Sequence, residues 1–336
     1  MGIDLPCDDH VLPAAESPLS TPLDIIKLNG KTAGNRIAIH PMEGWDGTKT
    51  GGVTKEMKRR WQRFGMSGAK LILGGEAMAV RHDGRANPNQ LIISNENKSE
   101  IAGLLELLLD SHQEKYDTTE DLVVGFQLTH SGRFCRPNEH SQFEPRVAYR
   151  HPILDSKFKV TSDKQLWTDD EIDELIQCYI RAARIAADIG ADFVDIKHCH
   201  GYLLHEFLGA HTRPGRYGGS FENRTRILSQ IINGIRSDRN QIDIIVRLSA
   251  FDLVPFRSDP EKSSSGKLGP GIPENFSHCL PYNYGFGVNP DNPLEYDLNE
   301  PQKFIKLCSE LGVKLVSLSA GSPYYNPHIQ RPAIYP

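Results

Sequence analysis

Short apolar runs rich in β-branched residues alternate along the chain with longer stretches whose apolar residues recur at helical spacing. The predicted strands cover residues 36–42, 69–75, 121–128, 191–197, 242–250 and 314–320. The predicted helices between them cover residues 54–68, 99–116, 168–190, a segment from about residue 221, and residues 300–313. The pattern predicts six strands and five helices in strict alternation.

The helix over 168–190 has the clearest signals. Thr168 and Glu171 have the spacing of a capping box, in which each side chain bonds the other residue's backbone N–H. Gly190 supplies the conformational freedom with which helices commonly end. We therefore expect the next strand to start directly after this glycine.

Strict alternation of apolar strands and helices predicts a parallel sheet covered by helices, as a doubly wound sheet or a barrel. A doubly wound sheet most often carries a glycine-rich phosphate turn after its first strand, and the glycines that follow residue 42 do not form GxGxxG. Polar residues instead gather at many strand ends, in HPME, GGEA, QLTHSGR, KHCHGY and RLSA. This distribution predicts a TIM (β/α)8-type barrel with about six of its eight strand-helix units in this chain.

The chain divides into an N-terminal extension (1–23) and the barrel domain (24–336). One long irregular stretch, 251–301, is rich in Pro, Gly, Ser and Asn and leaves the predicted catalytic face after the fifth strand. Loops of this length are usually functional or disordered. We read it as a lid or specificity loop; the alternative is a mobile insertion without a role.

Composition narrows the class of protein. Of 336 residues, 38% are hydrophobic and 24% charged, the balance of an ordinary globular protein. A net charge of -5 and the lack of basic runs argue against nucleic-acid binding. The sequence shows neither about 18 consecutive apolar residues nor a signal-peptide pattern, so we expect no membrane span and a cytoplasmic location. The six cysteines lack CxxC spacing, so we expect no metal.

Five motifs in order carry a family resemblance: NRIAIHPM, QLTHSGR, HGYLLHEFL, RYGGSFENRTR and VRLSA. Together they resemble the Old Yellow Enzyme family of FMN-dependent ene-reductases, including its dienoyl-CoA-reductase-like members. The resemblance runs from about residue 24 to 325. It implies a barrel that holds FMN across its strand ends.

The resemblance also implies which residues contact FMN: His40, Pro41, Met42, Glu43, Ala77, Gln127 and Arg247. By similarity, Gln127 bonds the pyrimidine edge and Arg247 lies near N1 and O2. Reduced flavin gathers negative charge at N1 and O2, so a fixed cation there stabilises it. The alternative for Arg247 is a salt bridge to an interior carboxylate.

In the family, a His-x-x-His or His-x-x-Asn pair bonds the substrate's carbonyl oxygen, and a tyrosine two residues later protonates the α-carbon. His200 and Tyr202 match the second member and the tyrosine, while Lys197 replaces the first member. His198 is no substitute, because the two-residue period of a strand turns it away from Lys197. The implied reaction passes hydride from NADH or NADPH through FMN to the activated C=C of an α,β-unsaturated carbonyl, acid or thioester. For Tyr202 the alternative is a rim aromatic that packs on loops.

Lys197 has three readings. It can form an internal ion pair with Asp195, or it can replace the histidine as a cation suited to a carboxylate or thioester oxygen. The third reading is the Schiff-base lysine of a TIM-barrel lyase, because burial lowers the pKa of a lysine. Glu43 stands where family members usually carry Thr or Cys, and we expect it to pair with a cation such as Lys197 or to be protonated.

The family pattern needs two further strand-helix units, which carry the FMN phosphate site, and the sequence ends before them. We therefore expect a C-terminally truncated chain that binds flavin weakly, exposes sheet edges and associates as a homo-oligomer. A non-catalytic barrel that serves as a binding module is the third candidate function.

Overall fold

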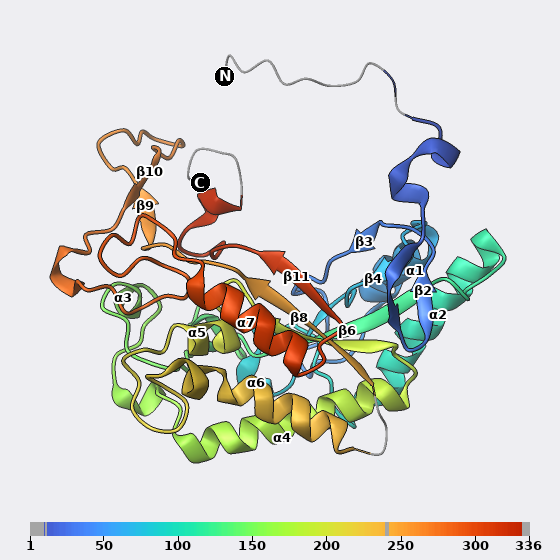
Figure 1. Cartoon of the computed structure of the whole chain (residues 1–336), viewed down its shortest axis with the longest axis horizontal. Coiled ribbons are helices and arrows are strands. Elements are labelled where there is room, and N and C mark those ends of the chain that lie inside the picture. Colours follow the sequence, from blue (N-terminus) through green and yellow to red (C-terminus); the bar gives the residue numbers. More distant parts are fainter. Residues whose placement is uncertain (1–9, 11, 239–241, 331–336) are drawn as a thin grey trace.

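The computed structural model describes residue 10 and residues 12–238 and 242–330. Its centre is a curled parallel sheet in the order β11-β8-β7-β6-β4-β3, with β5 paired to β6 (Figure 1). The strands are β3 (Ala38–Ile39), β4 (Leu71–Ile72), β5 (Ala77–Ala79), β6 (Val123–Thr129), β7 (Phe193–His198), β8 (Asp243–Ser249) and β11 (Leu315–Ser319). In the described chain, the outer strands β3 and β11 do not pair with each other.

One long helix follows each of the first five strand positions. These helices are α1 (Lys55–Met66), α2 (Lys98–Tyr116), α4 (Asp169–Asp188), α6 (Phe221–Arg236) and α7 (Asn299–Glu310). Helix α1 packs on α2, and α4 packs on α6 beneath the sheet in the view of Figure 1. The predicted alternation of six strand positions and five helices is confirmed, although β3 and β4 are shorter than predicted.

Helix α4 shows how the local sequence sets an element. The Thr168 side chain accepts from the backbone N–H of Glu171, and the Glu171 carboxylate accepts from the N–H of Thr168. Gly190 follows the helix with a φ of +91°. The helix buries one apolar face, made of Ile172, Leu175, Ile176, Tyr179, Ile180, Ala182, Ala183, Ile185 and Ala186. The predicted capping box and stop are therefore confirmed.

The sheet has two apolar faces. Val194 and Ile196 belong to the larger cluster shared with the helices, whereas Phe193 belongs to a smaller cluster inside the curl of the sheet. The ring of Phe193 fills the space where a side chain at Gly125 would lie. Alternate residues of β7 therefore point to opposite faces, as the two-residue period requires.

A hairpin that the sequence pattern did not predict covers the amino-terminal end of the curled sheet. Its strands β1 (Leu23–Leu28) and β2 (Lys31–Ala33) pair antiparallel. Leu28 and Ala33 are buried in the smaller cluster with Phe193. The hairpin thus closes the end of the barrel opposite the predicted site.

The 251–301 segment is packed rather than free of contacts. It contains the antiparallel strands β9 (Phe256–Ser258) and β10 (Gly271–Pro273). It also has its own buried cluster, formed by Val254, Cys279, Tyr282 and Val288. Its role as a lid or specificity loop, like the domain boundary at residue 23, stays a prediction.

The remaining elements are short. Helices α3 (Leu154–Lys157) and α5 (Leu203–Leu208) lie in the loops after β6 and β7. Single 3-10 turns cover Ala14–Glu16, Pro18–Ser20, His82–Gly84, Gly132–Phe134, Asp163–Gln165, Ser277–Cys279 and Pro327–Ile329. No described helix is both long and apolar enough to cross a bilayer.

Candidate active site

The strand register brings most of the predicted site residues to one end of the sheet. Ala77 lies level with Gln127, and Gln127 lies level with Asp195. Two residues further along β7, Lys197 lies level with Arg247 of β8. Carboxyl ends of parallel strands meet at one face, which is where barrel enzymes place their sites.

Lys197 forms a buried ion pair with Glu43. Its side chain is 2% exposed and that of Glu43 is 19% exposed. The Lys197 ammonium also lies 3.4 Å from the centre of the Tyr202 ring, a cation–π contact. Of the two alternatives expected for Glu43, pairing with a cation is the one found, and the cation is Lys197.

Asp195 has a different partner from the one considered above. Gln127 donates its amide N–H to the Asp195 carboxylate at 2.6 Å. Burial raises the pKa of Asp195 to about 7, although the Gln127 hydrogen bond and the charges of Arg247 and Lys197 oppose this. An ion pair between Asp195 and Lys197 is therefore not the arrangement found. Among the described carboxylates, none forms a salt bridge with Arg247 either.

His200 and Tyr202 come from the turn that follows β7. His200 has a φ of +64° and Gly201 has a φ of +76°. The His200 imidazole Nε2 lies 3.0 Å from the Ser319 hydroxyl, and burial together with the charge of Lys197 lowers its pKa to about 2. This histidine is therefore neutral, and it can donate a hydrogen bond without carrying charge.

Tyr202 is 1% exposed, so it is not a rim aromatic on the protein surface. His198 lies on the opposite side of β7, where its ring centre is 5.6 Å from that of Phe304 in α7. The prediction that His198 turns away from Lys197 is confirmed.

The segment that follows β3 lies beside β5. The backbone N–H of Ala77 donates to the carbonyl of Met42 at 3.0 Å, and the Met42 side chain is 71% exposed. Pro41 is buried, while much of His40 remains exposed; partial desolvation of its imidazole and the charge of Arg247 lower the pKa of this ring. Gly74, with a φ of +131°, fits closely here, because a Cβ would lie 2.8 Å from the backbone nitrogen of Gln127.

The buried polar atoms without a hydrogen-bond partner at these strand ends include Gln127 Oε1, Asp195 Oδ1 and Arg247 Nε. Buried polar groups in proteins are nearly always paired, so an unpaired acceptor and an unpaired donor at one site indicate a ligand or water that pairs them. A flavin has a ring edge with both donors and acceptors. The residues present therefore fit FMN.

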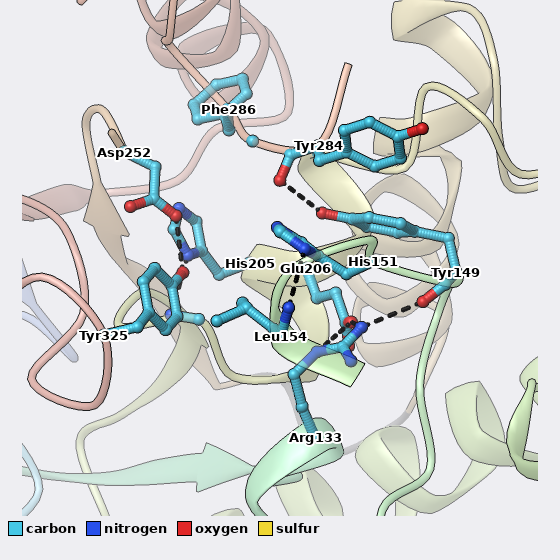
Figure 2. A pocket seen from close by; sticks show the side chains of 13 residues that line it. Arg133, Tyr149, His151, Leu154, His205, Glu206, Asp252, Tyr284, Phe286 and Tyr325 are labelled. Carbon is cyan, nitrogen blue, oxygen red and sulfur yellow. Dashed lines mark hydrogen bonds and ion pairs between the residues drawn. The ribbon is translucent and has the colours of Figure 1, made fainter. Parts of the chain in front are cut away.

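A second polar region, which the sequence reasoning did not predict, adjoins the His200–Tyr202 turn. Its cavity has a volume of 20 Å³, room for about one water molecule, and lies among Tyr149, His151, His205 and Asp252 (Figure 2). His205 accepts from the backbone N–H of Gly201 at 2.8 Å through Nδ1. This bond ties the turn to the cavity wall.

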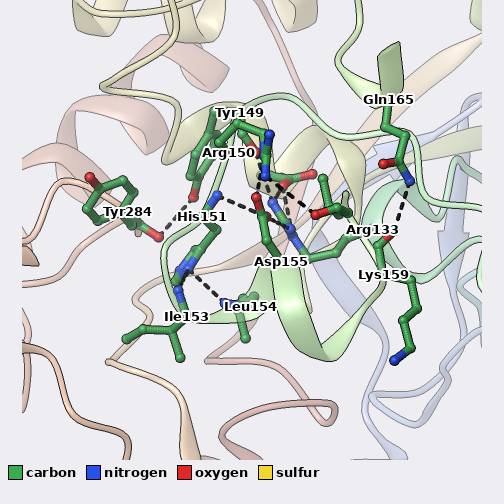
Figure 3. A network of polar contacts seen from close by, with 12 residues as sticks. Arg133, Tyr149, Arg150, His151, Ile153, Leu154, Asp155, Lys159, Gln165 and Tyr284 are labelled. Atoms are coloured by element: carbon green, nitrogen blue, oxygen red, sulfur yellow. Dashed lines mark hydrogen bonds and ion pairs between the residues drawn. The ribbon is translucent and has the colours of Figure 1, made fainter. Parts of the chain in front are cut away.

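A buried charge network holds the same wall. The Arg133 guanidinium donates to Glu206, to Asp155 and to the carbonyl of Tyr149 (Figure 3). Arg150 reinforces Asp155 from the outside. Arg133 and Glu206 each lie inside a quoted motif, QLTHSGR and HGYLLHEFL, and their opposite charges are the signal that could have paired them.

Comparison with known proteins places the chain in a family. The model of the NADH:flavin oxidoreductase / NADH oxidase family matches residues 19–262, which is more than half of the chain. The chain belongs to this family. An NADPH dehydrogenase of Geobacillus sp. (strain WCH70) is 33% identical over 233 residues, 68% of this chain and 63% of that protein. The matched part of the chain thus spans less than two thirds of this curated relative.

Solved structures support the fold. Old Yellow Enzyme from Pichia sp. AKU4542 aligns with a TM-score of 0.63 and 20% identity over 91% of this chain and 72% of its own. The Old Yellow Enzyme homologue of Zymomonas mobilis aligns with a TM-score of 0.62 and 21% identity over 95% and 81%. The predicted TIM-barrel class and the resemblance to the Old Yellow Enzyme family are confirmed.

Proposed function

We propose that the protein is an FMN-dependent oxidoreductase that takes electrons from NADH or NADPH and reduces the activated C=C of an α,β-unsaturated carbonyl, acid or thioester. The observation that carries this proposal is the pair of neighbouring cations Lys197 and Arg247 at the strand ends, beside the unpaired Gln127 Oε1 and Arg247 Nε. Family membership supports the flavin-dependent oxidoreductase part of this proposal.

The residues that would hold FMN are those of the predicted set. Gln127 Oε1 is free to accept from a ring N–H, and Arg247 Nε is free to donate to a ring oxygen or nitrogen. The other residues of this set lie on two adjoining segments that the Ala77–Met42 backbone hydrogen bond joins: His40, Pro41, Met42 and Glu43 on one, and Ala77 on the other. When bound, FMN supplies hydride to the β-carbon of the alkene. Arg247 then offers a fixed positive charge, which needs no reorganisation during the reaction.

Lys197, His200 and Tyr202 would act on the substrate. Negative charge develops on the carbonyl oxygen as the β-carbon is reduced, and the Lys197 ammonium together with a neutral His200 N–H would stabilise it. Tyr202 would give a proton to the α-carbon. Because a lysine stands where relatives carry a histidine, an anionic or strongly polarised oxygen is the favoured acceptor.

The test compares substrates and variants. The FMN-loaded chain, supplied with NADPH or NADH, should reduce an enoate or enoyl thioester faster than a neutral enone, and Lys197→Met should remove this preference. Lys55→Met is the matched control, since the Lys55 side chain is 91% exposed and its ion-pair partner is the neighbouring Glu56. If the parent oxidises NADPH but reduces none of these alkenes, the proposal is wrong.

Experiments on the same purified protein distinguish the other candidate functions. A Schiff-base lyase would form an adduct on Lys197 that borohydride traps with a carbonyl substrate; the ion pair of Lys197 with Glu43 does not favour it. A non-catalytic barrel would oxidise no NADPH. A cytoplasmic location and a homo-oligomeric state stay predictions.

A further inference from the structure

The phenol of Tyr202 has a second tyrosine as its partner. The hydroxyl oxygens of Tyr202 and Tyr324 lie 2.7 Å apart, the distance of a good O–H···O hydrogen bond. The Tyr324 ring stacks on Phe134, with ring centres 4.1 Å apart and planes 22° apart. Tyr324 follows β11 and lies beyond the residues that match the family model.

The segment that carries Tyr324 is anchored next to the turn that carries Tyr202. The adjacent Tyr325 donates its hydroxyl to Asp252 at 2.6 Å (Figure 2), and Asn326 also donates to Asp252. A Cβ at Gly201 would lie 2.8 Å from the Tyr325 ring, so the two segments are in close contact. The hydrogen bonds to Asp252 and the close packing at Gly201 therefore hold the two tyrosine hydroxyls next to each other.

The two phenols differ in their access to water. Tyr202 is fully buried, whereas Tyr324 is partly exposed. Burial raises the pKa of both, of Tyr324 to about 12 and of Tyr202 further above its ordinary value. Of the pair, Tyr324 is the member that exchanges its proton with solvent more readily.

A buried proton donor needs a route by which its proton is restored. Once Tyr202 has given up its proton, its phenolate has Lys197 over the ring and the Tyr324 hydroxyl beside the oxygen. The other ionisable groups around the pair are Glu43, Cys199, Cys135 and Arg136. Tyr324 is the hydroxyl in direct contact with the phenol and the one with access to solvent.

We propose that Tyr324 acts through Tyr202 as a proton relay, restoring the Tyr202 proton from solvent after each transfer to substrate. This inference rests on the proposed function. In each transfer the Tyr202 O–H bond breaks, and a C–H bond forms at the α-carbon with the electron pair of the enolate. The phenolate then takes the Tyr324 proton, and water replaces the proton of Tyr324.

The first test follows the hydrogen bond itself and needs no substrate. Replacing Tyr202 with a polyfluorinated tyrosine lowers the pKa of this phenol enough that it ionises before Tyr324, and fluorine NMR of the isolated protein follows this ionisation. Adding Tyr324→Phe keeps the ring on Phe134 but removes the donor to the phenolate, so the ionisation midpoint should rise by about one pH unit. Tyr296→Phe is the matched control, since Tyr296 is 60% exposed, and it should leave the midpoint unchanged.

The second test follows turnover. Tyr324→Phe should slow alkene reduction by about tenfold, which is less than the roughly 100-fold or more that loss of a general acid itself costs, because Tyr324 only restores the proton of Tyr202. It should leave NADPH oxidation with a quinone unchanged, because that acceptor needs no carbon protonation. The double variant with Tyr202→Phe should be no slower than Tyr202→Phe alone, since Tyr324 acts only through Tyr202.

The outcomes separate the two proposals. An unchanged fluorotyrosine midpoint in Tyr324→Phe overturns the role of Tyr324, and so does an equal loss with alkene and quinone acceptors, which indicates a merely structural residue. If Tyr324→Phe shifts the fluorotyrosine midpoint but the parent protein reduces no alkene, the proposed function is overturned instead.

Discussion

Glu43→Gln should destabilise the protein, because it leaves the Lys197 ammonium buried without its carboxylate. Removing one partner of a buried ion pair costs about 3–5 kcal/mol when both charges are fully buried. Here Glu43 is 19% exposed, and the Tyr202 ring stays 3.4 Å from the ammonium. We therefore expect less than this full cost, about 2–3 kcal/mol.

The chain length converts this into a melting temperature. At about 2.1 cal/mol/K per residue, the unfolding entropy of a 336-residue chain is roughly 0.7 kcal/mol/K, so Tm should fall by about 3–4 °C. Calorimetry of the purified parent and variant measures this shift. The double variant Glu43→Gln with Lys197→Met removes both charges and should recover most of the loss, since an apolar replacement of a buried pair is often neutral.

Two results would contradict this reasoning. If Glu43→Gln melts with the parent, the ammonium has no need of the carboxylate. If the double variant loses as much as the two single variants together, the residues do not act as a pair. Glu43→Gln alone should also bind an anionic substrate more tightly, because Lys197 is freed from its internal partner.

Other substitutions test further parts of the site. Burial raises the pKa of Asp195 to about 7, so the folded protein favours the protonated carboxyl. The stability that this preference contributes is complete below the ordinary pKa of an aspartate and is lost as pH rises through about 7. Asp195→Asn keeps an acceptor for Gln127 but has no carboxyl group to ionise. Between about pH 5 and pH 8, the free energy of unfolding measured in urea should therefore fall by up to about 3 kcal/mol more in the parent than in Asp195→Asn. Equal falls in the two proteins would refute this. Gly74→Ala should cost about 1–3 kcal/mol in the same assay, since φ is +131° and the new Cβ would meet the Gln127 backbone, whereas Gly103→Ala, with open space around it, should cost nothing. An equal loss in both glycine variants would indicate a general helix or strand effect instead.

The sequence predicts the framework well because hydrophobic period is a local property. The helix over 169–188 has its capping box and its glycine stop within the chain segment itself. The turn of His198 away from Lys197 likewise follows from the period of one strand. Such features need no knowledge of the rest of the molecule.

Contacts between distant segments were harder to predict. The partner of Lys197 was open between Asp195 and Glu43, and the strand period alone favours Asp195; the structure shows Glu43, which lies 154 residues away. Tyr324 carries no motif, and its place beside Tyr202 depends on how the segment after β11 folds onto Asp252. The apolar pattern does not predict the β1–β2 hairpin, because its strands are short and only partly buried.

The most direct test of the whole account is an FMN titration of the purified chain, followed by flavin fluorescence, with Arg247→Met beside the parent. The account predicts that the parent binds FMN and that Arg247→Met binds it at least about tenfold more weakly, because a charge-assisted contact is lost. A parent that binds no FMN, or a variant that binds it as tightly, would contradict the assignment of this end of the sheet as the flavin site.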